Sequence, residues 1–218
     1  MKKIACFVLA LLITAGLAAR LQAQTVSSYN FTSTTGNTYT ALDGTATTVS
    51  GVASVSGAFE DMFFNATESV DHNETSALAG IPIGFDFLFD GQTYDKFVIG
   101  GCGFIVLGNN SSENVSLGSN AFRFWTPIIG ICSDEGVNKI GTTTIKYKLE
   151  GSTPNQVMTV EYTDIDYSGN MTSENAMCYQ IKLYESDNHI EFIFGKDASF
   201  EGASCWLGIG IRGAGGAH

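Results

Sequence analysis

Residues 81–108, IPIGFDFLFDGQTYDKFVIGGCGFIVLG, decide the fold of this chain. Apolar residues alternate with other residues over Ile83–Phe89, which is the pattern of a strand with one buried face. Asp90-Gly91 follows at once, and this dipeptide can supply the two positive-φ positions of a type I′ turn. Apolar residues resume on the return, and a third apolar run, Phe104–Leu107, follows a glycine-rich corner. The stretch predicts three antiparallel strands whose aromatic face needs a second layer to cover it.

Strand signals recur along the rest of the chain. Two more pairs of apolar runs flank polar turn segments, EGSTPNQ and SDNH, and each pair predicts another antiparallel hairpin. A strand interrupted at Pro127 is also predicted, because proline cannot donate a hydrogen bond to a ladder. The strands predicted after residue 108 are residues 121–131, 145–149, 157–162, 178–185, 190–194 and 206–211.

The N-terminal part of the exported chain predicts short edge strands rather than a core. It is rich in Thr, Ser and Gly, with β-prone pieces at residues 29–31, 38–41 and 47–49. Residues 58–79 hold four large apolar side chains near their start, and the polar stretch DHNETSALAG (71–80) that follows is predicted to be a loop that leads to the first core strand. With about ten short strands and almost no helical periodicity, the sequence predicts an all-β, antiparallel β-sandwich of jelly-roll-like architecture. A small outer-membrane β-barrel is the alternative, since such barrels also alternate apolar and polar residues.

The first 23 residues predict an export signal. Two lysines precede an apolar stretch, residues 4–19, and Leu21-Gln22-Ala23 forms an A-x-A-like cleavage site. Residues 24–218 are then expected to form a single β-sandwich domain, either alone or as the N-terminal part of a longer protein. No later run is apolar enough to cross a bilayer as a helix. The expected location is therefore secreted or at the outer cell surface.

The net charge of the chain limits the classes of partner that it is expected to bind. It contains 11 basic and 22 acidic residues, and removing residues 1–23 takes away three basic residues and no acid. The exported part therefore holds 8 basic against 22 acidic residues, a net charge of −14. Such a net charge argues against nucleic acid and anionic membrane surfaces as binding partners. We expect an extracellular glycan or protein as the partner.

Four cysteines remain after export: Cys102, Cys132, Cys178 and Cys205. An even number of cysteines in an oxidising compartment predicts disulfides, and four cysteines allow three connectivities. The expected strand order favours the pairs Cys178–Cys205 and Cys102–Cys132, because each pair would lie at the ends of neighbouring strands. Zinc is a rival explanation that the spacing does not favour, since no pair is arranged as C-x-x-C.

Carboxylates offer one candidate metal site, for calcium. Asp164 and Asp166 flank Ile165 near a predicted strand end, where alternation would point both side chains to the same side. Asp134-Glu135 lies in a predicted loop, and oxygen ligands at such places can hold calcium. A solvated acidic rim is favoured over calcium because the EF-hand spacing is absent. No other cofactor is expected.

Four aromatic residues are candidates for a platform that stacks on sugar rings: Trp125, Trp206, Tyr162 and Tyr167. Burial in the core is the commoner fate of such residues.

No catalytic residue is predicted. The chain has neither a G-x-S-x-G nor an H-E-x-x-H motif, and His72 in a polar loop is its one candidate base. Residues 208–213 match G-x-G-x-x-G as letters, but the strand and helix that this fingerprint needs around it are missing. The alternative to a binding module is a glycoside-active jelly-roll enzyme, which would use a pair of carboxylates.

Several segments in one order resemble a known family. The chain is similar to the N-terminal β-sandwich module of exported surface proteins from Gram-negative bacteria that use type IX secretion, over residues 27–214. A fainter similarity links it to nidogen-type extracellular domains. The resemblance implies a non-enzymatic role in adhesion or in carbohydrate or protein recognition. Besides residues 81–108, the segments that carry it are KYKLEG (146–151), PNQVMTVEY (154–162), QIKLYES (180–186), NHIEFIFG (188–195) and WLGIGIRGA (206–214).

The exported protein should begin at Gln24, because the A-x-A-like site ends at Ala23. Intact-mass spectrometry of secreted material measures this directly. A mass that still includes residues 1–23 would contradict the predicted cleavage.

Overall fold

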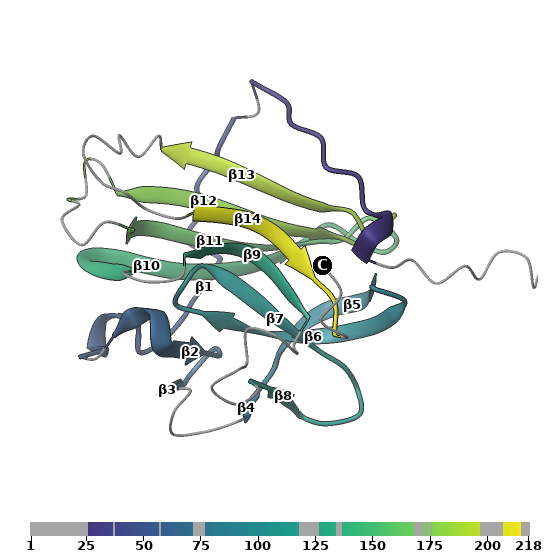
Figure 1. The fold of residues 1–218 in the computed structure, drawn as a ribbon, viewed down its shortest axis with the longest axis horizontal. Helices are drawn as coiled ribbons and strands as arrows, with labels where there is room; N and C mark the ends of the chain where they lie inside the picture. Colours follow the sequence, from purple (N-terminus) through teal and green to yellow (C-terminus); the bar gives the residue numbers. More distant parts are fainter. Residues whose placement is uncertain are drawn as a thin grey trace, which may run out of the picture.

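The fold is a sandwich of two antiparallel sheets (Figure 1). The computed structural model describes residues 26–214 except 37, 57, 72–76, 118–126, 134–136, 168–171, 173, 175 and 197–206. No helix in this part of the chain is long and apolar enough to span a membrane. The prediction of an all-β, antiparallel β-sandwich is confirmed.

One sheet has five strands and the other has seven, and a two-stranded ribbon flanks them. The five-stranded sheet has the order β1 (Thr47–Thr48), β10 (Asn138–Glu150), β11 (Val157–Asp166), β12 (Met177–Tyr184) and β13 (Ile190–Lys196). The seven-stranded sheet has the order β14 (Leu207–Arg212), β9 (Ile128–Ser133), β7 (Phe104–Gly108), β6 (Gln92–Gly100), β2 (Met62–Phe64) and β3 (Ser69–Asp71), with β5 (Ile81–Phe89) paired to β6. The ribbon pairs β4 (Ala77–Ala79) with β8 (Asn114–Ser116), and three short 3-10 turns, η1 (Val26–Ser28), η2 (Val52–Ser54) and η3 (Phe59–Asp61), lie in the N-terminal third.

The β5–β6 hairpin forms as its sequence predicts. Phe89 pairs with Gln92, so the turn has two residues, and both have positive φ, 49° at Asp90 and 72° at Gly91. This is the type I′ geometry, whose twist matches that of the flanking strands. Every second residue of β5 from Ile81 to Phe89 is buried and the residues between them are exposed. The aromatic face of this hairpin therefore lies in the core of the sandwich.

The other predicted hairpins, β10–β11 and β12–β13, are also present, whereas the N-terminal predictions need correction. Residues 29–31 and 38–41 are not strands, and of the three β-prone pieces only residues 47–49 contain one, the two-residue β1. The predicted loop, residues 71–80, contains the short strand β4, while residues 72–76 lie outside the described residues. Strand β9 begins directly after Pro127, and residues 121–126 lie outside the described residues. Short segments depend on their tertiary neighbours for pairing, so local propensity decides little there.

The centre of the sandwich holds three buried tyrosines beneath the corner that joins β6 to β7. The Tyr162 ring stacks on Tyr179 with 4.8 Å between centroids, and its hydroxyl donates to Phe104 O at 2.8 Å. The Tyr167 hydroxyl lies 3.3 Å from that of Tyr179. Gly103, with a φ of 97°, leaves no space for a side chain, because an added Cβ would lie 2.2 Å from the Tyr179 hydroxyl. The cluster joins the corner of one sheet to β11 and β12 of the other.

Truncation of the aromatic face should strongly destabilise the domain. Phe87 is fully buried on β5, so Phe87→Ala is expected to lower the free energy of unfolding by about 3–5 kcal/mol. The matched control is Leu88→Ala on the same strand, where the side chain is 37% exposed and the loss should be much smaller. Urea denaturation of both variants measures the difference. Equal stability of the two would contradict the register of β5.

Candidate functional site

A row of polar side chains on the outer face of the five-stranded sheet is buried. Thr159, Glu161 and Gln180 alternate with core residues of β11 and β12 and so point away from the core, yet none is more than 2% exposed. Glu161 and Gln180 are directly opposite each other in the ladder. Residues 39–43, called the strap below, contact Glu161 and Gln180 of this row.

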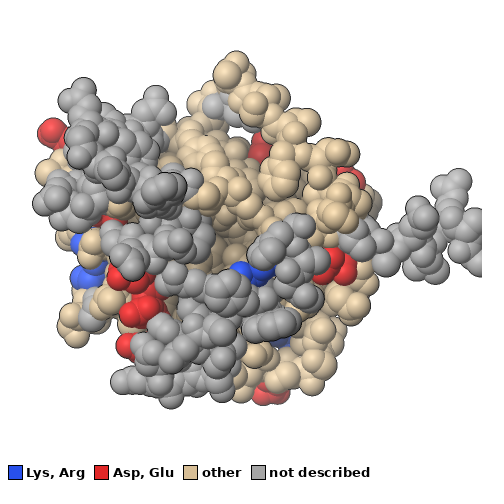
Figure 2. Space-filling model, viewed as in Figure 1, with Lys and Arg blue, Asp and Glu red and all other residues tan. Residues whose placement is uncertain are grey.

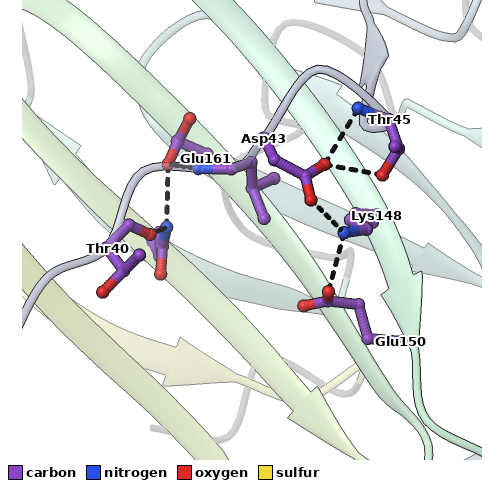
Figure 3. A network of polar contacts seen from close by, with 8 residues as sticks. Thr40, Asp43, Thr45, Lys148, Glu150 and Glu161 are labelled. Atoms are coloured by element: carbon purple, nitrogen blue, oxygen red, sulfur yellow. Dashed lines mark hydrogen bonds and ion pairs between the residues drawn. The ribbon is translucent and has the colours of Figure 1, made fainter.

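One carboxylate oxygen of Glu161 is the centre of this site. Glu161 Oε2 accepts hydrogen bonds from the backbone N–H of Leu42 at 2.8 Å, from the Tyr39 hydroxyl at 3.0 Å and from Gln180 Nε2 at 2.8 Å. Gln180 Nε2 also donates to the backbone carbonyl of Thr40 at 2.8 Å (Figure 3). Hydrogen bonds to a charged acceptor are stronger than neutral ones, about 1.5–3 kcal/mol each. Glu161 and Gln180 together therefore bind one backbone N–H group and one backbone C=O group of the strap.

An ion pair fixes the C-terminal end of the strap. Lys148 Nζ lies 3.0 Å from Asp43 Oδ2 and 2.7 Å from Glu150 Oε1 (Figure 3). The pKa of Asp43 is lowered to about 2 by its hydrogen bond from the Thr45 hydroxyl and by Lys148. Because the pKa is depressed, Asp43 stays charged until the pH falls towards 2, and the contact persists at mildly acidic pH.

The ring of Tyr39 holds the N-terminal end of the strap. The Tyr39 ring lies directly on Gly195 of β13, where an added Cβ would come within 2.4 Å of it. Burial and the neighbouring Glu161 carboxylate raise the pKa of Tyr39 above its usual value. The hydroxyl therefore remains a proton donor to Glu161 across the physiological pH range.

This arrangement holds a chain segment and is poorly suited to proton transfer. A general base needs an accessible lone pair within reach of the proton that it abstracts. The Glu161 oxygen that faces the strap already accepts three hydrogen bonds, and the side chain is 1% exposed. We therefore interpret the site as a binding surface for extended backbone. Sequence reasoning missed this site, because Glu161 and Gln180 occupy positions that alternation assigns to solvent.

The predicted carboxylate site does not form as expected. Asp164 has a φ of 55° at an irregularity in the β11–β12 register, which breaks the alternation that would have placed it beside Asp166. Asp164 Oδ1 lies 3.6 Å from the Cys178 thiol, and Asp166 is buried with 3% exposure. Among the described residues no group of three His, Cys, Asp or Glu side chains could hold a metal ion. The candidates Asp134 and Glu135 lie outside the described residues.

The predicted aromatic platform also needs correction. Tyr162 and Tyr167 are fully buried members of the core cluster, so neither presents a ring face to solvent. Their hydroxyl groups instead contact backbone carbonyls at the β6–β7 corner. Trp125 and Trp206 lie outside the described residues.

The disulfide pairs stay predictions. Cys102 Sγ lies 3.1 Å from Glu60 O, and Cys178 Sγ lies beside Asp164 in the other sheet. Cys205 and the side chain of Cys132 are outside the described residues. The pairing of Cys102 with Cys132 is consistent with the backbone, since the β7–β9 register continues into a hydrogen bond from Ile131 N to Gly103 O at 3.0 Å.

Comparison with known proteins places this sandwich in a family. A family model described as "NIDO related" matches residues 28–218, nearly all of the chain after the predicted signal. The chain belongs to the NIDO-related family. No curated protein and no solved structure matches this NIDO-related domain. The nidogen-type similarity expected from the sequence agrees with the family, whereas the type IX secretion route stays a prediction.

Loss of the Tyr39 hydroxyl should loosen the strap. Tyr39→Phe keeps the ring on Gly195 but removes a donor to Glu161, so we expect a loss of about 1–2 kcal/mol in the free energy of unfolding. Tyr184→Phe is the matched control, since it also removes a hydroxyl that donates to a carboxylate, Glu191, but at the β12–β13 hairpin and not at the strap. Chemical denaturation compares the two variants. A smaller loss for Tyr39→Phe than for the control would show that the strap contributes little.

Proposed function

We propose that this NIDO-related domain is a non-enzymatic recognition module that works outside the cell or at its surface, in adhesion or in binding a protein or glycan. The export signal and the net negative charge support an extracellular setting without nucleic acid or anionic membrane as partners. The resemblance to exported surface modules supports the same role.

The observation that carries the proposal is the exposed apolar edge of the seven-stranded sheet. Strand β14 is the last strand of this sheet, and Ile209 in its middle is 49% exposed. Next to it, a Cβ added at Gly210 would meet nothing within 4 Å, so a partner can approach the backbone closely. Extended peptides add to such edges through main-chain hydrogen bonds.

The five-stranded sheet ends in a similar way. Strand β13 is its last strand, and Phe194 is 36% exposed there. Natural proteins commonly protect edge strands with charges, proline or covering segments, because a bare apolar edge promotes aggregation. Apolar residues at both edges therefore favour a partner protein over a glycan.

The described carboxylates support a binding role over glycoside hydrolysis. Hydrolysis needs two carboxyl groups that face the same sugar, about 5–10 Å apart. Asp166 is 3% exposed and Glu161 is 1% exposed under the strap, so neither can reach a polymeric substrate. On the face drawn in Figure 2, acidic side chains of the described residues appear at several separate places.

Binding assays with the exported chain test this proposal. We expect saturable binding to at least one member of a panel of purified extracellular proteins or of a glycan array. Ile209→Lys should weaken that binding at least tenfold while the melting temperature stays near that of the wild type, since the side chain is half exposed. Phe31→Lys is the control, because Phe31 is 66% exposed on the N-terminal segment and not on β14. Glycoside turnover in the absence of saturable binding, or binding that Ile209→Lys leaves unchanged, would refute the proposal.

A further inference from the structure

The contacts that hold the strap could equally hold the strap of a second copy of this chain. It runs across the five-stranded sheet and meets a different strand at each step. The contacts are Tyr39 on Gly195 of β13, Thr40 on Gln180 of β12, Leu42 on Glu161 of β11 and Asp43 on Lys148 of β10.

These contacts define a ligand chemistry. Two of them are made to backbone groups, which selects an extended chain. The other two are made to a phenol and to a carboxylate four residues later, which selects a tyrosine and an aspartate. The outer face of the sheet is therefore a built peptide site whose present occupant is the chain itself.

The strap is attached to the body through side-chain contacts and not through a backbone ladder. Thr40 and Ala41 are exposed, and Tyr39 and Leu42 are only partly buried. Among the described residues, no backbone-to-backbone hydrogen bond joins residues 30–42 to the rest of the molecule. Segments with few buried apolar contacts open locally at a small fraction of the global free energy of unfolding.

A turn at the end of the strap can act as its hinge. Ala46 N donates to Asp43 O at 3.2 Å and Thr45 N donates to Asp43 Oδ1 at 2.9 Å, while Gly44 has open space around it. If this turn opens, residues 26–43, called the arm, could extend over roughly 55 Å. That reach is large compared with the separation of two small domains in contact.

We propose that the peptide site on the outer face of the five-stranded sheet accepts the arm of a second copy, so that two chains exchange arms. An exchanged arm remakes the same contacts, including that of Val26 N with Asp90 Oδ1 at 2.9 Å and the ring contact of Tyr29 with Phe89 at 5.6 Å. Exchange of an identical element is a low-cost route to dimers. This proposal concerns contacts of the chain with itself and does not depend on the partner proposed for β14.

Complementation between two full-length variants tests the exchange. The first variant carries Tyr39→Ala and Asp43→Ala, which weaken the arm and leave the site intact. The second carries Gly195→Ala, whose Cβ would clash with the Tyr39 ring, and Lys148→Met, which removes the ion-pair partner of Asp43, so the site is weakened and the arm is left intact. We expect each variant alone to be monomeric by light scattering, and the mixture to contain at least tenfold more dimer. A mixture that stays monomeric, although both variants keep the wild-type circular dichroism, would refute the second copy as the occupant.

A peptide measurement tests the site separately. The probe is a labelled synthetic peptide of residues 36–45, GNTYTALDGT, added to the full-length first variant. We expect saturable binding that a peptide with Tyr39→Ala loses at least tenfold. Equal binding of the two peptides, or no binding by either, would refute the peptide site itself.

Discussion

The two sheets are held in register by the contact between the β6–β7 corner and the tyrosines of the opposite sheet. The corner directs carbonyl groups into the core, where an unsatisfied polar group costs roughly 1–3 kcal/mol. Tyr162 donates to Phe104 O at 2.8 Å and lies 3.2 Å from Gly100 O, while the Tyr167 hydroxyl lies 3.5 Å from Cys102 O. Burial raises the pKa of Tyr162 well above its usual value, so its hydroxyl remains a donor. The corner can approach this closely because Gly103 has no side chain.

The outer face of the molecule follows from this inner contact. Because Tyr162 and Tyr179 face the core, the next residues along β11 and β12 must point outward, and these include Glu161 and Gln180. A carboxylate and an amide side by side on a sheet can bind an extended chain through its backbone. The strap takes that position, and Leu42 N is one of its donors to the carboxylate. The same alternation thus builds the core on one side of the sheet and a peptide site on the other.

The edge strands of this NIDO-related domain differ in whether a neighbouring segment covers them. Strand β5 lies beside the β12–β13 turn, where Asn188 Oδ1 accepts a hydrogen bond from Leu88 N at 2.8 Å. Asn188 has a φ of 60°, a conformation that asparagine tolerates better than most residues. Strands β13 and β14 instead end their sheets with Phe194 and Ile209 exposed. Covered edges prevent aggregation, whereas open edges allow an extended chain to add to the sheet.

Local sequence was enough to predict the hairpins, because the information they need is contained within a few residues. Asp90-Gly91 supplies the turn conformation and the alternation beside it assigns the buried face, so the turn and the core face of the β5–β6 hairpin could be predicted. The register irregularity between Pro82 and Phe87 was not predicted. The same reasoning failed at Asp164, where a positive φ and an irregularity in the β11–β12 register interrupt the alternation.

What the sequence alone determined is the all-β class, the antiparallel hairpins and their core faces, because strand period and turn chemistry are local properties. Only the tertiary structure decided that Tyr162 and Tyr167 are core donors rather than a ligand platform, and that Glu161 is buried on an outer face. Both outcomes depend on what covers a residue, and the covering groups are far away in sequence: the corner near residue 103 and the strap near residue 40. No local pattern carries that information.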